Sequence, residues 1–404
     1  MAPSMELYAC GFNAHNQLTF GHTPEGTPKN IYRLQKILSG TSIRLLFTGW
    51  STTVVEVDGT LRSNTGALKL PAGCSASDIN SVFGDHTGVL GALTTDGDLL
   101  VCKDDDGDEL IVAPAESGSN PDDASLRIAH LNISGTGKIC ISPFPSTSSN
   151  SPSEQPLSPS TSPPTLPQYP HYLHIHPTLP FLLQPPTPLT PQTHLLPQPP
   201  TQLLSSANTF TALLPSGEIY TWGDPRHHHL GRTPTPTTPA QEPGLVTALG
   251  GIAIRKVASG GWITGAVSGE GDLYVWGGRS GSSEGGERGA GRIRCLPSPW
   301  SAAGRRKDGE EVVEGEEEGE VALVDIAGGV DVADVGVGAG HMLALTDDGR
   351  VFGVGLNSNG QVGFGEGRRF CEDWVEVPMR VGEGREVVGV ECGYWSSFVL
   401  VRVV

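Results

Sequence analysis

One short pattern recurs along this chain. It consists of a glycine, a short apolar strand, a turn that contains glycine, a second strand and a closing glycine. The clearest copies are residues 338–355, 260–277 and 208–223, and in each copy the glycine of the turn precedes the closing glycine by six residues. A repeat of this kind constrains the fold of the whole chain more strongly than any single motif does.

Each copy of the repeat predicts a β-hairpin. Asp58-Gly59, Asp96-Gly97 and Asp348-Gly349 are turn dipeptides, because glycine tolerates positive φ and aspartate can bond its own backbone. The flanking residues alternate apolar and small side chains, as in strands with two unlike faces. One hairpin cannot bury its apolar face alone, so several must stack in a solenoid or as blades around an axis.

The two ends of the chain favour a closed ring. Residues 6–11 match the second strand of the repeat as it occurs at residues 218–223, and residues 392–400 match the first strand. The last half-repeat therefore lacks what the first half-repeat supplies. A linear solenoid would more often carry polar caps at its ends, so we expect one blade built from both termini.

The segment between the repeats identifies a family resemblance. Residues 355–363, Gly-Leu-Asn-Ser-Asn-Gly-Gln-Val-Gly, resemble the Gly-x-Asn-x-x-Gly-Gln-Leu-Gly signature of the regulator-of-chromosome-condensation (RCC) repeat, and residues 11–18 and 222–231 are decayed copies. The resemblance covers roughly residues 5–142 and 204–401. It implies a seven-bladed β-propeller, a fold also found in β-lactamase-inhibitor protein II.

We therefore predict an all-β propeller that is closed by pairing of the N- and C-terminal strands. Six blades are clear in the sequence, and a seventh is expected at residues 126–142, where Gly135-Thr136-Gly137 separates two apolar runs. The six clear blades are expected at 45–66, 79–102, 204–231, 255–277, 335–363 and, as the split blade, 387–401 with 5–18.

Two insertions are predicted to interrupt a single domain. The expected parts are a first propeller segment 5–142, a Pro/Ser/Thr-rich disordered insertion 143–203, a middle segment 204–277, a Gly-rich and then acidic disordered insertion 278–333, and a last segment 334–401. Residues 143–203 hold eighteen of the thirty-three prolines. Proline lacks a backbone donor and fixes φ, so we expect this insertion to stay out of the sheets.

Both insertions leave an alternative role open. The spacings Pro156 to Pro159 and Pro164 to Pro167 could dock a domain that recognises proline-rich segments, or the insertion could be a plain tether. The second insertion contains a basic cluster at residues 305–307 and an acidic run at 310–320. A solvated loop and a nuclear import signal are both conceivable for it.

Charge and cysteine content narrow the partners and the compartment. The net charge is −18, which repels phosphate backbones, and residues 1–5 contain no Lys or Arg. We expect no direct nucleic-acid binding. The seven cysteines are scattered without a C-x-x-C pair, which favours reduced thiols in the cytoplasm or nucleus. No long apolar run or signal peptide is evident, so we expect no membrane association, and we expect a monomer.

The sequence contains no set of residues that we expect to act in catalysis, to bind a cofactor or to hold a metal. Residues 227–229 are three consecutive histidines, which we interpret as exposed loop residues. His171, His174, His176 and His194 fall in the proline-rich insertion, where we expect no rigid geometry. Gly353 and Gly355 close a strand instead of opening a helix, so they do not fit a phosphate-binding loop.

Three tryptophans are the candidate partner-binding residues. Trp50, Trp262 and Trp395 are expected to share one register in their repeats, next to the position that His341 occupies in its own copy. Equivalent positions in a propeller lie on one ring, and tryptophan is enriched at binding hot spots. The same residues could instead be packed core between blades.

The resulting functional prediction is a non-enzymatic scaffold that binds one or more protein partners. The alternative is a guanine-nucleotide exchange factor for a Ran-type small GTPase, which the family resemblance alone suggests. No motif in this sequence matches exchange residues. A regulatory subunit that guides another enzyme to its target is a third hypothesis.

Overall fold

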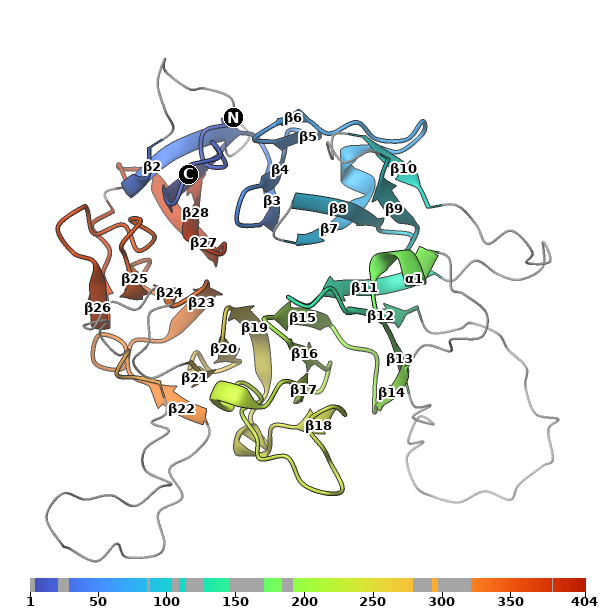
Figure 1. The fold of residues 1–404 in the computed structure, drawn as a ribbon. Helices are drawn as coiled ribbons and strands as arrows, with labels where there is room; N and C mark the ends of the chain where they lie inside the picture. Colours follow the sequence, from blue (N-terminus) through green and yellow to red (C-terminus); the bar gives the residue numbers. More distant parts are fainter. Residues whose placement is uncertain are drawn as a thin grey trace, which may run out of the picture.

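The chain folds into seven four-stranded antiparallel sheets, which surround a common axis as the blades of a propeller (Figure 1). This confirms the predicted all-β propeller and its seven blades. The structure is a computed structural model. It describes residues 4–20, 29–85, 88–103, 109–113, 127–144, 171–183, 192–278, 293–296, 321–379 and 381–404.

Blades 1 to 3 follow one another along the first half of the chain. Blade 1 consists of β3 (Ile43–Thr48), β4 (Thr53–Val57), β5 (Thr60–Ser63) and β6 (Gly66–Ala67). Blade 2 consists of β7 (Ile79–Asp85), β8 (Gly88–Thr94), β9 (Leu99–Cys102) and β10 (Leu110–Val112), and blade 3 consists of β11 (Ile128–Ile133), β12 (Ile139–Pro143), β13 (His171–His176) and β14 (Gln192–Leu196). A short helix, α1 (Leu179–Leu183), and a 3₁₀ turn at Ala76–Asp78 accompany them.

Blades 4 to 6 follow the same order from inner to outer strand. They consist of β15 (Gln202–Ser206), β16 (Thr209–Leu213), β17 (Ile219–Gly223) and β18 (Gly244–Leu245); of β19 (Ile254–Gly260), β20 (Ile263–Ser268), β21 (Leu273–Gly277) and β22 (Val321–Val324); and of β23 (Val332–Val337), β24 (His341–Thr346), β25 (Val351–Leu356) and β26 (Phe370–Glu376). Two further 3₁₀ turns lie at Arg226–His228 and Thr247–Leu249.

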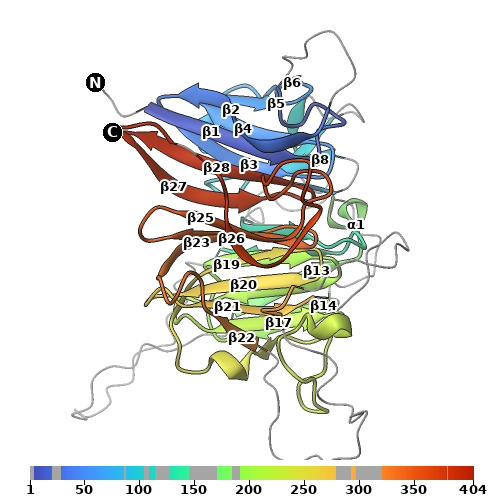
Figure 2. The ribbon, with the colours of Figure 1, turned by 90° about the vertical axis from the view of Figure 1, so that its left-hand side faces the viewer.

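Blade 7 joins the two ends of the chain. Its strands are β27 (Arg385–Cys392), β28 (Ser396–Val403), β1 (Ser4–Gly11) and β2 (Ile31–Gly40), in the order β2-β1-β28-β27. β1 pairs with β28 without a register shift from Ser4 opposite Val403 to Gly11 opposite Ser396. Both views show the two strands side by side (Figures 1 and 2). The predicted closure of the ring is confirmed.

A buried carboxylate strengthens this closure. Glu6 on β1 accepts hydrogen bonds from Arg385 on β27 (3.0 Å), from Lys36 on β2 (3.1 Å) and from the Tyr8 hydroxyl (3.0 Å). The hydrogen bond from Arg385 is the main cause that lowers the pKa of Glu6 to about 2, against an opposing contribution from burial. The charged network thus spans three of the four strands of blade 7.

The hydrophobic core is divided into seven clusters, each lying between two neighbouring blades. The cluster between blades 7 and 1, for example, contains Leu7 and Phe398 together with Val55. Each blade therefore buries both faces, because a hairpin that is apolar on two sides needs a neighbour on each. The turn Asp58-Gly59 connects β4 to β5 with both residues at positive φ (50° and 75°), as the dipeptide predicts.

The prediction that residues 143–203 stay out of the sheets is wrong for their described part. β13 pairs with β12 and β14, so the third blade extends to Leu196. Both strands contain no proline, and prolines directly flank each of them in the sequence. Proline is disfavoured only in the interior of a strand. The alternation of side-chain types from His171 to His176 was a strand signal that the sequence interpretation missed.

The second insertion is also shorter than predicted. β22 supplies the outer strand of blade 5, and residues 325–331 lead directly into β23. Ile293 and Leu296 are buried in the cluster between blades 5 and 6. The two Pro-x-x-Pro spacings, the basic cluster at 305–307 and the acidic run at 310–320 lie outside the described residues. No helix in the described ranges is long and apolar enough to cross a membrane.

Replacing Phe398 with alanine tests the closure. Phe398 is 1% exposed in the cluster between blades 7 and 1. We expect the variant to lose about 3–5 kcal/mol of unfolding free energy, because it leaves a cavity in the closing blade. Urea denaturation followed by circular dichroism measures this loss. The matched control is Phe144→Ala, since Phe144 is 42% exposed, and its loss should be clearly smaller. Equal losses of unfolding free energy in the two variants would contradict the proposal that packing in the closing blade stabilises the fold.

Candidate functional site

The turns between the first and second strands of neighbouring blades are bonded to one another. Ala339 N–H in blade 6 donates to Tyr394 O in blade 7 (2.9 Å), and the Ser206 hydroxyl in blade 4 donates to Gly261 O in blade 5 (3.1 Å). These bonds place the turns at one end of the ring. We call this end the rim; it includes residues 49–52, 134–138, 207–208, 261–262, 338–340 and 393–395.

Five aromatic side chains form a cluster on the rim, where blades 7 and 1 meet. Trp395 contacts Phe12 (ring centroids 5.5 Å apart), Trp50 (6.2 Å) and Tyr394 (5.3 Å). Phe12 also stacks on Trp50 at 6.2 Å, and His15 lies edge-on to Trp50 at 5.1 Å. We call Phe12, His15, Trp50, Tyr394 and Trp395 the rim aromatic cluster.

Backbone contacts from both ends of the chain hold this cluster in place. Phe12 N–H donates to Trp395 O (2.9 Å), directly beyond the β1–β28 pairing. The Gln17 side chain donates to Trp50 O (3.0 Å), and the Asn64 side chain donates to His15 O (2.9 Å). The cluster therefore exists only when the ring is closed.

The rim aromatic cluster presents apolar surface to solvent. Tyr394 is 41% exposed, and Trp50 and Trp395 are partly exposed. The indole nitrogen of Trp50 is buried without a hydrogen-bond partner in the described part of the chain. Partly exposed aromatic side chains with rigid support are typical of protein-binding hot spots.

Trp262 does not belong to this cluster. It lies edge-on to His227 (4.7 Å) and to His229 (5.7 Å), and the Arg226 guanidinium lies 5.6 Å from its ring. The turn of blade 6, with Ala339 and Gly340, lies between the blades of Trp262 and Trp395. The structure thus brings two of the three predicted tryptophans together and places the third in a separate group on the same rim.

The predicted common register holds for Trp262 and Trp395 but is wrong by one residue for Trp50. Gly393 N–H bonds Ser396 O, and Gly49 N–H bonds Thr52 O. Trp395 is therefore the second residue of its turn, whereas Trp50 is the first, the position that Tyr394 occupies in blade 7. Because glycines occur at more than one position of these turns, the sequence allows two alignments of the repeats. Only the strand pairing shows which alignment is correct.

His341 is fully buried and does not face a partner. Its Nε2 lies 3.0 Å from the Ser397 hydroxyl on β28, so the residue links blades 6 and 7. Burial lowers the pKa of its imidazole to about 4. Of the four candidate residues, His341 is a packing residue, while the three tryptophans remain at the surface of the rim.

Other histidines also differ from the prediction. His229 is buried instead of exposed, its Nε2 lies 3.0 Å from the Ser206 hydroxyl, and burial lowers its pKa to about 4. His171 and His194 lie on strands of blade 3 and are buried, not held in a loop. The Ser–His pairs among the described residues are thus buried at or near blade interfaces. The described residues contain no group of three His, Cys, Asp or Glu side chains suited to a metal.

A charged group lies on the inner strands, close to the axis. Lys256 on β19 pairs with Asp334 on β23, whose second oxygen accepts the Val390 N–H at 3.0 Å. Glu391 on β27 keeps part of its surface in contact with water. Neighbouring protein atoms reduce its hydration, and this effect, opposed by Lys256 and reinforced by Asp334, raises the pKa of its carboxyl to about 7. These contacts tie three neighbouring blades together.

Comparison with known families agrees with the blade geometry. Residues 216–267 and 348–400 match one model of the regulator of chromosome condensation (RCC1) repeat, and residues 332–361 match a second. The seven blades and these repeats define the class as an RCC1-type β-propeller. The chain thus contains RCC1 repeats, as its sequence resemblance predicted.

Several curated relatives share these repeats. The chain is 30% identical to human RCC1 domain-containing protein 1 over 202 residues, which cover 46% of this chain and 51% of the relative. It is also 30% identical to the ultraviolet-B receptor UVR8 of Arabidopsis thaliana over 210 residues (45% and 46%) and to the human E3 ubiquitin-protein ligase HERC2 over 199 residues (47% and 3%). The matches span about half the length of RCC1 domain-containing protein 1.

A solved structure supports the fold at low sequence identity. Yeast RCC1 (Prp20), crystallised with Kap60 bound, matches with a TM-score of 0.63 and 12% identity over 100% of this chain and 90% of that chain. This likeness concerns the fold.

The rim also contains residues that the sequence interpretation missed, namely Phe12, His15 and Tyr394. Phe12 and His15 lie in the decayed repeat at residues 11–18, and Tyr394 directly precedes Trp395. Ring closure brings both segments together, so a search for aromatic residues next to the closing strands would have found them.

Protonation of buried histidines should make stability depend on pH. Because the folded-state pKa of His341 is about 4 and that of an unfolded histidine is about 6.5, the unfolded chain binds more protons between these values. Stability is therefore full above about pH 6.5 and falls toward pH 4, by at most about 3 kcal/mol for this residue. Thermal denaturation from pH 7 to 4.5 should show a shallower decline in His341→Gln than in the wild type. An unchanged slope would contradict this assignment.

Proposed function

We propose that this protein is a non-enzymatic scaffold that binds a protein partner through the rim aromatic cluster. The observation that carries the proposal is the contiguous group formed by Trp50, Trp395 and the 41% exposed Tyr394. Large aromatic side chains that are held rigidly contribute most to protein–protein affinity. The seven interlocked blades supply that rigidity.

The chemistry of the rim supports binding more than catalysis. The described histidines that lie near hydroxyls, His171, His229 and His341, are buried. Burial lowers the pKa of all three imidazoles, so they stay neutral and enclosed. A general base must reach the proton it removes from a substrate, and none of the three imidazoles is exposed to one.

The names of the relatives show how varied the uses of this fold are. They include an ultraviolet-B receptor and a ubiquitin-protein ligase. Since one fold supports many functions, the activity of any single relative does not transfer to this chain. The ligase favours the hypothesis that this propeller guides an associated enzyme to its target, which would also use a binding surface.

Guanine-nucleotide exchange on a Ran-type GTPase is the second candidate. Its support is the fold-level likeness to yeast RCC1, which was crystallised with Kap60 and studied for its binding to Gsp1p and histones. Mixing the purified chain with Ran loaded with a fluorescent guanine nucleotide tests this candidate. Accelerated nucleotide release would replace the scaffold proposal, and an unchanged rate would count against exchange.

Replacing Tyr394 with alanine tests the scaffold proposal. We expect captured partner proteins, quantified by mass spectrometry after affinity purification from a cell lysate, to fall at least about tenfold, because a central aromatic contact contributes about 2 kcal/mol. Thermal stability should change little, since Tyr394 is at the surface. The matched control is Tyr172→Ala, whose side chain is 50% exposed on β13. Equal retention by both variants would contradict a rim interface.

A further inference from the structure

A pocket of about 280 Å³ lies between blades 3 and 4, away from the rim aromatic cluster. Its floor is the stacked pair of Phe210 and Trp222, whose ring centroids lie 5.6 Å apart. Lys138, Gln192 and Gln241 line its edge and are exposed, so the pocket is open to solvent.

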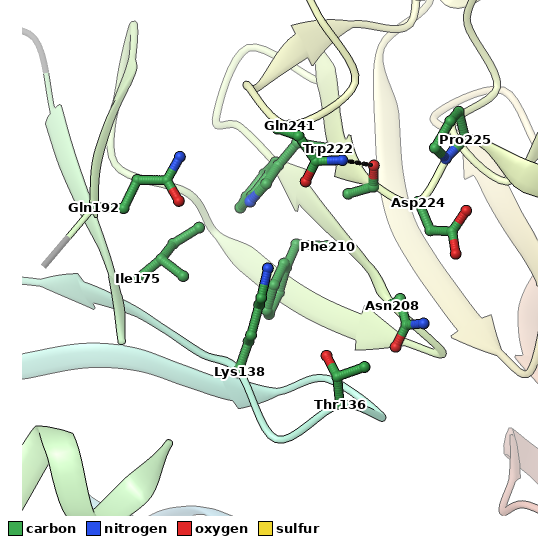
Figure 3. A pocket seen from close by; sticks show the side chains of 11 residues that line it. Thr136, Lys138, Ile175, Gln192, Asn208, Phe210, Trp222, Asp224, Pro225 and Gln241 are labelled. Atoms are coloured by element: carbon green, nitrogen blue, oxygen red, sulfur yellow. Dashed lines mark hydrogen bonds between the residues drawn. The ribbon is translucent and has the colours of Figure 1, made fainter. Parts of the chain in front are cut away.

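The floor of this pocket contains an unsatisfied donor. Trp222 is only 1% exposed, and its indole nitrogen has no hydrogen-bond partner among the described residues. In Figure 3 this nitrogen lies on the side of the ring that faces Gln192, Ile175 and Lys138 across the pocket. A buried donor without an acceptor is energetically unfavourable, so a bound acceptor at this place would be favourable.

Two other blades show which acceptor fits this position. Trp276 in blade 5 precedes its closing glycine as Trp222 does, and its Nε1 donates to His229 O at 3.2 Å. Cys10 takes the same place in blade 7, and its Sγ donates to Gln361 O at 3.5 Å. In both cases the acceptor is a backbone carbonyl in the loop that follows the third strand of the preceding blade.

Blade 3 does not supply that carbonyl within its described residues. After β13 the chain enters α1, whose Leu179 and Leu182 pack against the cluster between blades 2 and 3. α1 therefore lies on the side of blade 3 away from blade 4 (Figure 1). In blades 5 and 7, a connecting loop from the preceding blade covers the position that corresponds to Trp222. The pocket occupies the corresponding space in blade 4.

The charges at the pocket favour an anionic ligand. Lys138 extends from the rim turn of blade 3 toward Phe210 (Figure 3) and forms no ion pair with the described residues. The Asp224 carboxylate is neutralised by the Arg226 guanidinium, whose Nε lies 2.8 and 2.9 Å from its two oxygens. The ammonium group of Lys138 is thus a charge at the edge that no ion pair of the described residues compensates.

We propose that this pocket binds an acidic peptide segment of a partner protein. A backbone carbonyl of the peptide accepts the Trp222 indole N–H, as His229 O does for Trp276, and a carboxylate beside it pairs with Lys138. The inference rests on the proposed role as a scaffold and adds a second binding surface of defined chemistry.

A library of random heptapeptides displayed on phage, selected on the full chain, tests this site. We expect enrichment of peptides with Asp or Glu. A synthetic peptide from the selection should bind Lys138→Glu about tenfold more weakly, the factor for a lost charge-assisted hydrogen bond. The control Lys29→Glu reverses the charge of an exposed lysine next to β2 and should bind as the wild type does. Absence of enrichment, or equal binding by both variants, would overturn the proposal.

A second measurement tests the indole donor in the wild-type chain, so that its result does not depend on how a substitution in the core affects folding. In the wild-type chain labelled with ¹⁵N-tryptophan, the indole proton of Trp222, assigned with Trp222→Phe, should shift downfield when the peptide is added. No shift would argue against the site. A change of this signal on deletion of residues 184–191, before any peptide is added, would identify the protein's own chain as the occupant and would also overturn it.

The two proposals fail separately. A partner whose capture depends on Tyr394 but not on Lys138 would leave the rim interface intact and exclude the peptide pocket. Peptides that bind through Lys138, combined with partner capture that is insensitive to Tyr394→Ala, would support the pocket and exclude the rim.

Discussion

The pairing of β1 with β28 is the constraint on which the rest of the structure depends. Eight residue pairs join the two ends of the chain in one uninterrupted register. Each cluster of the core needs blades on both sides, so an open ring would expose two apolar faces at once. Glu6 adds charged hydrogen bonds across the same blade. Closure thus joins seven small sheets, each of which needs a neighbour on both faces, into one continuous ring.

Closure also builds the candidate interface. Phe12 follows β1 and Trp395 precedes β28, so the strand pairing that completes blade 7 brings the two rings within 5.5 Å. The rim aromatic cluster is therefore a product of the topology as much as of the residues. The pocket between blades 3 and 4 arises in the opposite way, because α1, the described part of the connection after β13, packs toward blade 2 and the indole nitrogen of Trp222 has no hydrogen-bond partner among the described residues. Regular repeats produce the scaffold, and departures from the repeat produce the surfaces available for binding.

Most of the fold could be predicted from the repeated hairpin, the Asp-Gly turns and the matching half-repeats at residues 6–11 and 392–400. The third blade shows the limit. Proline content predicted disorder for residues 143–203, yet the proline-free stretches that became β13 and β14 complete a sheet, because pairing with β12 compensates for weak local signals. Composition averages over a segment, whereas a strand needs only five or six suitable residues.

The sequence by itself determined the repeat, six of the seven blades and the closure of the ring, because glycine turns and alternating strands are local features with a fixed period. It also placed tryptophans on the rim. Only the tertiary structure decided that Trp50 and Trp395 touch while Trp262 lies apart, and that His341 is buried behind Ser397. These outcomes depend on which turn a neighbouring blade presents, and such contacts between residues far apart in the chain leave no periodic signal.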